Sequence, residues 1–149
     1  MIVIGLPCVP MRYSSEQNCG MLKCIFLLRR RSELTIEQFR LHWRERHAPL
    51  VRAHANVLGV QRYVQTLELH DRAVQAGAMA TRGCPPADFD GCAELWWESL
   101  ESYGRMRTNP EALPALRLLV EDERRFIDME RSLIWYGLET TIVDETGAS

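Results

Sequence analysis

Short apolar runs alternate along the chain with segments of helical periodicity. Residues 22–28, 60–69, 92–98 and 132–143 are short and rich in aliphatic and aromatic side chains, which predicts four β-strands. Between the first and second runs, and again between the third and fourth, apolar residues recur every three or four positions and predict helices. The order strand, helix, strand, strand, helix, strand is the split βαβ pattern. We therefore predict an α+β, ferredoxin-like fold (βαββαβ), with a four-stranded antiparallel sheet and the helices on one face.

The first predicted helix has a well-defined start and an apolar face. Thr35 is a favourable N-cap, and Gln38 completes a capping box three residues later. Phe39, Trp43 and His47 follow at spacings of four, so they share one side of the helix, while arginine and glutamate occupy the other. This face is expected to pack towards the sheet and to carry His47 into the gap between helix and sheet.

A proline interrupts this helical pattern. Pro49 lacks a backbone donor and disfavours helical dihedrals at Ala48, so the helix is expected to break or kink just after His47. A second short helical piece is expected over residues 52–56.

The second half of the chain also contains residues that start and interrupt helices. Ser99 caps a helix, and the pair Asn109-Pro110 divides the helical region into two pieces, with Pro114 near the start of the second. Residues 70–90 are rich in Ala, Gly and Pro and predict a long loop, within which one helical turn is expected near residues 73–78.

Length and composition indicate one domain. The chain has 149 residues, and 46% of them are hydrophobic, which suffices for one core. We assign residues 21–143 to the domain, residues 1–20 to a disordered or loosely attached extension, and residues 144–149 to a mobile tail.

The net charge, the length of the apolar runs and the cysteine spacing indicate which partners and which cellular location to expect. The net charge of −2 lacks the basic excess of a nucleic-acid-binding surface, so no nucleic-acid partner is expected. No apolar run reaches the length of a membrane span, so no membrane partner is expected either. The five cysteines show no CxxC spacing and no histidine at metal-ligand spacing, so we expect a reduced, cytoplasmic protein without a metal site.

A sheet covered by helices on one face leaves the other face bare. That face carries Trp and aliphatic side chains, and burying it against a second copy predicts a homodimer. Coverage by the N-terminal extension is the alternative.

Candidate chemistry centres on His47. Imidazole titrates near neutral pH, which suits general acid/base catalysis; the alternative is a structural histidine bonded to a strand carbonyl at the kink. Glu94 lies on a predicted strand on the same face as Trp96, and is exposed, paired with an arginine such as Arg62, or a pocket acid beside His47. Tyr63 offers a phenol to a pocket, or serves as a core or interface aromatic.

Four aromatic residues complete the candidate site. Phe39, Trp43, Tyr63 and Trp96 are assigned to substrate binding, with packing in the core or dimer as the alternative. The sequence contains no glycine-rich phosphate loop, no GxSxG nucleophile and no HExxH motif, so no nucleotide or metal cofactor is expected.

Three segments resemble the EthD family, named from ethyl tert-butyl ether degradation. They are LTIEQF at 34–39 with Trp43 and HAPLV at 47–51, FDGCAELWW at 89–97, and DERRFID at 122–128. The resemblance covers nearly the whole predicted domain and implies a dimeric α+β barrel. Its wider superfamily includes cofactor-free monooxygenases, polyketide cyclases, lactone isomerases and haem enzymes.

These observations support a cofactor-independent enzyme that acts on a small apolar or aromatic, oxygenated metabolite. His47 would act as the acid/base, with Glu94 or Tyr63 assisting, in isomerisation, dehydration or cyclisation; oxidative chemistry is the second option. The alternatives are a non-catalytic protein that binds a hydrophobic ligand or assists an oxidative degradation pathway, and a haem-binding protein. Fold resemblance alone does not decide among them.

Overall fold

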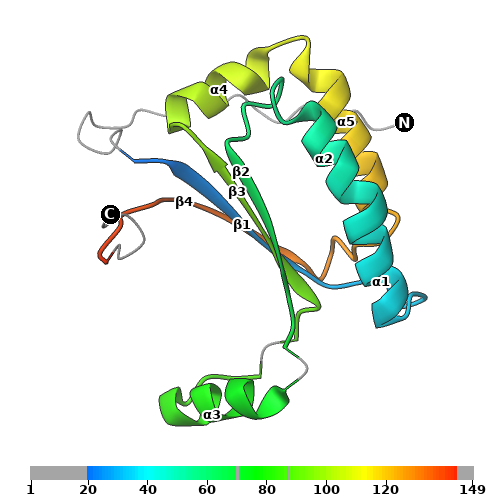
Figure 1. Cartoon of the computed structure of the whole chain (residues 1–149), viewed down its shortest axis with the longest axis vertical. Coiled ribbons are helices and arrows are strands. Elements are labelled where there is room, and N and C mark those ends of the chain that lie inside the picture. The colour runs from blue at the N-terminus through cyan, green and yellow to red at the C-terminus, as the bar shows by residue number, and fades with distance from the viewer. Residues whose placement is uncertain (1–19, 70, 87, 144–149) are drawn as a thin grey trace, which may run out of the picture.

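Four antiparallel strands form one open sheet in the order β2-β3-β1-β4. The strands are β1 (Leu22–Leu28), β2 (Arg62–Leu67), β3 (Gly91–Trp97) and β4 (Leu133–Leu138). β1 pairs with both β3 and β4, and β2 pairs with β3, all antiparallel. The structure is a computed structural model, and it describes residues 20–69, 71–86 and 88–143. The predicted ferredoxin-like α+β fold is confirmed, and the sheet does not close on itself within one chain (Figure 1).

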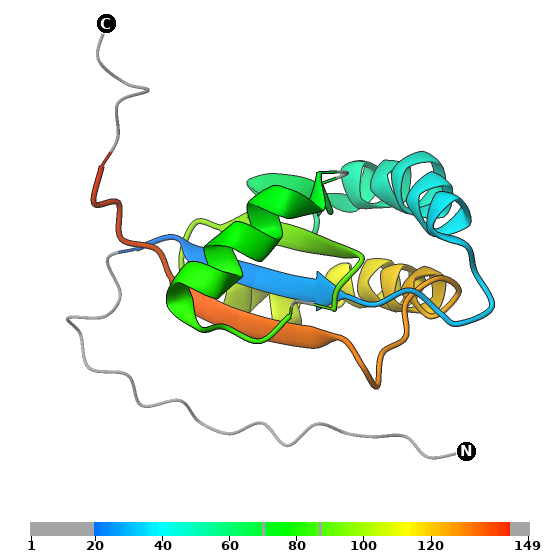
Figure 2. The same ribbon diagram turned by 90° about the horizontal axis from the view of Figure 1, so that it is seen from below.

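Helices cover one face of this sheet, as predicted, and leave the other open (Figures 1 and 2). They are α1 (Ile36–His42), the π-helical turn η2 (Trp43–His47), α2 (Ala48–His54), α4 (Leu100–Thr108) and α5 (Ala112–Glu123). The capping box of Thr35 and Gln38 is present, and Ser99 caps α4. None of the helices in the described ranges is long and apolar enough to cross a membrane.

The expected break after His47 does not occur. Ala48 has helical dihedrals (φ −60°, ψ −41°), and its N–H donates to the carbonyl of Trp43 in a π-helical turn. Because this turn widens the helix just ahead of Pro49, the chain accommodates the proline and continues as α2.

The predicted loop over residues 70–90 contains a helix at residues 72–82, longer than the single helical turn expected at residues 73–78. α3 spans Arg72–Arg82; the Asp71 carboxylate caps its start, and Gly83 ends it with a φ of 64°. These two caps and an alanine-rich sequence stabilise the helix locally. α3 projects past the ends of β2 and β3, on the side that the other helices leave open, and most of its side chains are exposed (Figure 1).

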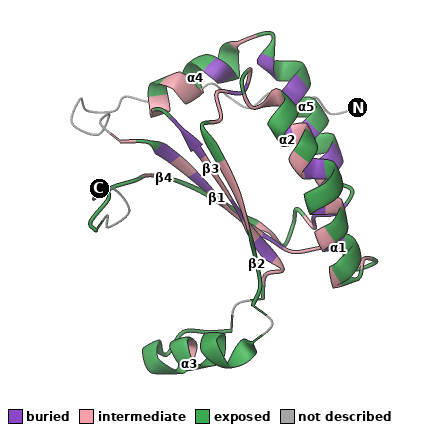
Figure 3. Ribbon diagram, viewed as in Figure 1, coloured by how far each residue is buried: buried purple, intermediate pink, exposed green. Residues whose placement is uncertain are grey.

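The buried residues concentrate between the sheet and its helices (Figure 3). By contrast, the outer face of the sheet carries exposed apolar side chains. Trp135 is 63% exposed and Leu133 59% exposed, and strand alternation places both on the uncovered face beside Ile25. The proposed extension over residues 1–20 lies outside the described residues except for Gly20, and so does the tail over residues 144–149.

Candidate functional site

A buried carboxylate holds two histidines together. His47, on η2, is 4% exposed, and its Nδ1 lies 3.0 Å from Oδ2 of the buried Asp122 on α5. Nε2 of His42 lies 3.0 Å from Oδ1 of the same carboxylate. Since an ionised carboxylate only accepts hydrogen bonds, Nδ1 of His47 carries the proton and donates it to Asp122. In the neutral ring Nε2 is therefore the free base.

That free nitrogen faces a second carboxyl group. Nε2 of His47 lies 3.9 Å from Oε1 of Glu123, whose side chain is 22% exposed. Burial, with the charge of Asp122 adding to it, raises the pKa of Glu123 to about 7. Burial also lowers the pKa of His47, and the hydrogen bond that His47 donates to Asp122 opposes that shift. A carboxyl group with a raised pKa beside the unprotonated nitrogen of a neutral imidazole can exchange a proton with that nitrogen.

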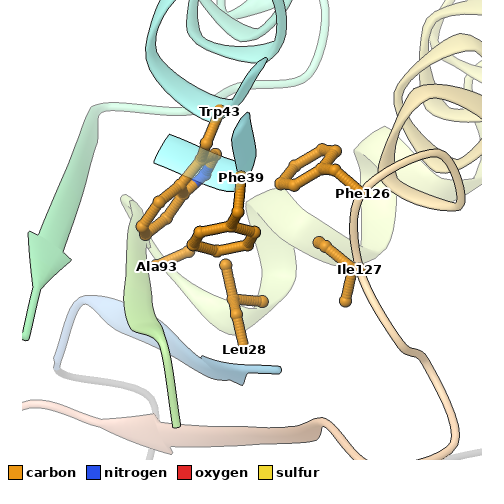
Figure 4. Close-up of a cluster of buried hydrophobic side chains, with 6 residues drawn as sticks. All are labelled: Leu28, Phe39, Trp43, Ala93, Phe126 and Ile127. Atoms are coloured by element: carbon orange, nitrogen blue, oxygen red, sulfur yellow. The ribbon is translucent and has the colours of Figure 1, made fainter. Parts of the chain in front are cut away.

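Aromatic side chains surround this pair. The ring of Phe126 stacks on His42 at 4.7 Å and contacts His47 at 5.3 Å between centroids. Phe39 and Trp43 are 0% and 1% exposed and belong to the same core cluster (Figure 4). The structure therefore places these two predicted substrate-binding residues in the packed core that supports His47.

Tyr63 lies on the same side of the sheet as His47. Its hydroxyl accepts hydrogen bonds from Nε1 of Trp43 and from Nε2 of Gln65, both at 2.9 Å. Burial raises the pKa of Tyr63 to about 12, so the phenol keeps its proton at neutral pH. Tyr63 also lines a groove between α2 and the edge strand β2.

This groove has a volume of about 410 Å³. Its apolar side is formed largely by α2. Its polar side chains are Arg44, Arg52, Gln61, Arg62, Tyr63 and Gln65. No aspartate or glutamate lines it among the described residues.

Glu94 and Trp96 lie on the opposite face of the sheet. Register pairs Glu94 with Ile25 and Trp96 with Lys23, outside the face that the helices cover. Nζ of Lys23 lies 2.8 Å from Oε1 of Glu94, so the partner of this carboxylate is a lysine, and Arg62 instead stacks on Trp96 at 4.7 Å. The sheet separates Glu94 from His47, and the idea that Glu94 is a pocket acid beside His47 is wrong for this chain.

Sequence reasoning did not assign roles to Asp122 and Glu123. One signal was available, because the buried residues of α5 are Ala112, Ala115, Leu119 and Asp122, at helical spacing. A carboxylate in an apolar stripe requires a buried partner. Among the described residues, no group of three or more His, Cys, Asp or Glu side chains is arranged to hold a metal ion.

Comparison with known proteins identifies the family. The protein-family model of the EthD domain matches residues 31–130. The chain belongs to the EthD family. The EthD-family match spans α1, η2, the sheet strands β2 and β3, and α5, and so includes both His47 and Asp122.

Relatives of this EthD chain are similar at low identity. A Claviceps purpurea protein named "Decarboxylase" is 27% identical over 120 residues, which cover 77% of this chain and 81% of the relative. An EthD-like protein of Ralstonia eutropha has a TM-score of 0.55 at 16% identity, covering 85% of this chain and 96% of its own. An EthD-family protein of Bacillus halodurans has a TM-score of 0.54 at 19% identity, covering 80% and 99%. Both solved structures share the fold of this chain.

Proposed function

We propose that this EthD protein is a cofactor-independent enzyme that transfers protons on a small, oxygenated metabolite. The observation that carries this proposal is the arrangement of His47. Its Nδ1 is fixed by the buried Asp122 at 3.0 Å, and its Nε2 faces Glu123 at 3.9 Å. A buried imidazole with one nitrogen oriented by a carboxylate and the other free is a general acid/base arrangement.

The protonation state of each side chain decides its role in the proposed proton transfer. His47 removes or delivers the proton through Nε2, and Asp122 orients the ring and stabilises the imidazolium when it forms. Glu123 exchanges a proton with Nε2, since its raised pKa of about 7 leaves both forms populated near neutral pH. Tyr63 stays protonated and donates to a substrate oxygen on which negative charge develops.

Decarboxylation is the reaction that the name of one relative suggests. The Claviceps relative is named "Decarboxylase". In such a reaction the C–C bond to the carboxylate breaks and CO2 leaves. The electron pair of the broken bond stays on the substrate, which becomes an enolate. A proton from His47 or Glu123 then bonds to the carbon that carried the carboxylate. Isomerisation, dehydration and cyclisation, which the sequence also suggests, use the same base and the same hydroxyl donor.

A β-keto acid tests this proposal. Benzoylacetate loses CO2 to give acetophenone, and we expect the protein to accelerate this step above the spontaneous rate. In D2O the product should gain deuterium at its methyl carbon. His47→Ala should lower the rate by about 10²–10⁴-fold, the usual contribution of a general acid/base. Glu121→Gln, at an exposed position of α5, is the control and should leave the rate unchanged.

Two outcomes would count against the proposal. One is turnover that survives His47→Ala. The other is no acceleration of CO2 release from benzoylacetate or a panel of substituted aromatic β-keto acids, which would favour a non-catalytic ligand-binding protein.

We also propose a homodimer formed through the open face of the sheet. Trp135 and Leu133 are more than half exposed and lie beside Ile25 on that face. A contiguous apolar surface of this kind is stabilised by burial against a second copy. The Lys23–Glu94 pair on the same face would set the register of the two sheets.

A reducing, cytoplasmic setting is the location we propose. The described cysteines Cys24, Cys84 and Cys92 form no disulfide with one another. Burial raises the pKa of Cys24 to about 11, so this thiol stays protonated and behaves as a small apolar residue.

A further inference from the structure

The groove between α2 and β2 combines an apolar wall with uncompensated positive charge. Ala48, Val51 and Val60 contribute apolar surface, and three arginines line the same space. Arg44 pairs with Glu45 at 2.7 Å, and Arg62 stacks on its strand partner Trp96, which lies on the face of the sheet opposite to the helices. Arg52 has no carboxylate within 4.0 Å among the described residues, so its guanidinium is free to meet a ligand.

Tyr63 lines this groove, and its hydroxyl oxygen accepts two hydrogen bonds. The amide of Gln65 is oriented by the carbonyl of Trp43, to which Nε2 donates at 3.1 Å. The second N–H of the same nitrogen therefore donates to the Tyr63 oxygen, and the indole of Trp43 donates to it as well. With two donors on its oxygen, the phenol has its own O–H left to give. No acceptor for that proton is present among the described residues.

We infer that this groove binds a small aromatic organic acid, with its acid group towards Arg52 and a keto or phenolic oxygen on Tyr63. The apolar wall from α2 takes the ring. The inference rests on the function proposed above for treating the ligand as a substrate. His47 is not among the residues that line the groove, so binding in the groove and proton transfer by His47 are tested separately. The groove volume of about 410 Å³ lies in the range of small-molecule sites.

The two polar ends of the groove have different tasks. Arg52 is exposed, and an ion pair in water is weak, so it recruits the anion without holding the carboxylate tightly. Weak binding of the carboxylate suits a reaction that expels it as CO2. Tyr63 is half-buried, and its oriented O–H stabilises the oxygen that becomes negative.

The test is a binding measurement that does not depend on turnover. The probe is 3-acetylbenzoate, titrated into the ¹⁵N-labelled full chain at constant ionic strength and followed by amide chemical shifts. The shifts should concentrate in α2 and β2. Arg52→Gln should weaken the affinity about two- to fivefold, the effect of one exposed ion pair. Arg46→Gln, on the same helical segment but outside the groove, is the matched control and should bind as the unchanged protein does.

Tyr63→Phe distinguishes donation to the ligand from a structural role. It should weaken 3-acetylbenzoate roughly three- to tenfold, the effect of one hydrogen bond, and leave benzoate unchanged because benzoate lacks the ketone. Equal losses for both probes would overturn the role of Tyr63. Shifts that map away from α2 and β2 would overturn the site. So would equal affinity for neutral 3-acetylbenzamide, or identical behaviour of Arg52→Gln and Arg46→Gln.

This outcome is separate from the fate of the proposed reaction. His47→Ala should keep the affinity for 3-acetylbenzoate and lose acceleration of benzoylacetate decarboxylation. Binding in the groove without turnover would leave the site standing and remove the reaction. Turnover with no binding of the probe in the groove would do the reverse.

Discussion

His47 and Asp122 are 75 positions apart in the chain, yet their side chains meet at 3.0 Å inside the protein. This contact ties η2 to the last turn of α5 and fixes the free nitrogen of the imidazole. Fold and chemistry therefore depend on the same carboxylate.

Replacement of that carboxylate should affect both. Asp122→Ala leaves the Nδ1 proton of His47 without its acceptor and removes the partner of His42. We expect a loss of about 1–3 kcal/mol in the free energy of unfolding, the cost of unsatisfied buried polar groups. Urea denaturation measures it. Glu121→Ala, at the exposed neighbouring position, is the control, and an equal effect of the two substitutions would contradict the role of Asp122.

The raised pKa of Glu123 makes a prediction about pH. The pKa of Glu123 is about 7 in the folded protein and 4.5 for an ordinary glutamate, so the folded state holds the proton more tightly. The protonated Glu123 therefore contributes to the free energy of unfolding fully below pH 4.5, and this contribution is lost as the pH rises to about 7. Relative to Glu123→Gln, the protein should lose roughly 1–3 kcal/mol between these values. Urea denaturation of both proteins at a series of pH values measures the difference, and a difference that does not change with pH would contradict it.

The open sheet face predicts the effect of a surface charge. Trp135→Lys should convert the proposed homodimer to a monomer, because a lysine at the centre of an apolar interface is costly to bury. Light scattering coupled to size-exclusion chromatography measures the mass, and circular dichroism checks that the fold remains. Leu113→Lys, on the exposed side of α5, is the control and should leave the mass unchanged. A monomer before any substitution would remove the proposal.

Two glycines of α3 should respond in opposite directions. Gly77 lies mid-helix with nothing within 4 Å of an added Cβ, so Gly77→Ala should stabilise α3 by about 0.5–1 kcal/mol. Gly83 has a φ of 64°, so Gly83→Ala should destabilise the helix end by about 1 kcal/mol. Hydrogen exchange of the α3 amides reports both changes, and shifts of the same sign would contradict the prediction.

Local signals were sufficient to predict most of the fold. The capping box at Thr35, the cap at Ser99 and the short apolar runs each depend on neighbouring residues, and the structure contains all of them. The full length of α3 was not predicted, because Asp71 and Gly83, which cap its two ends, are residue types that are equally typical of loops.

The site was only partly predictable. The helical repeat placed His47 on a buried face, as observed. Strand alternation placed Glu94 beside Trp96 but did not say which face the helices cover, since both faces of the sheet carry apolar side chains. The contact with Asp122 joins distant segments, and no local pattern specifies such a contact.

The π-helical turn has a consequence for how the first helical segment meets the core. Phe39, Trp43, His47 and Val51 repeat strictly every four residues, and all four are buried. In a regular α-helix each step of four overshoots a full turn by about 40°, so such a row would spiral away from the core. The wider turn at Trp43–His47 takes up part of this rotation. Shortening it by one residue would turn α2 and its groove-lining side chains away from β2 while leaving α1 in place.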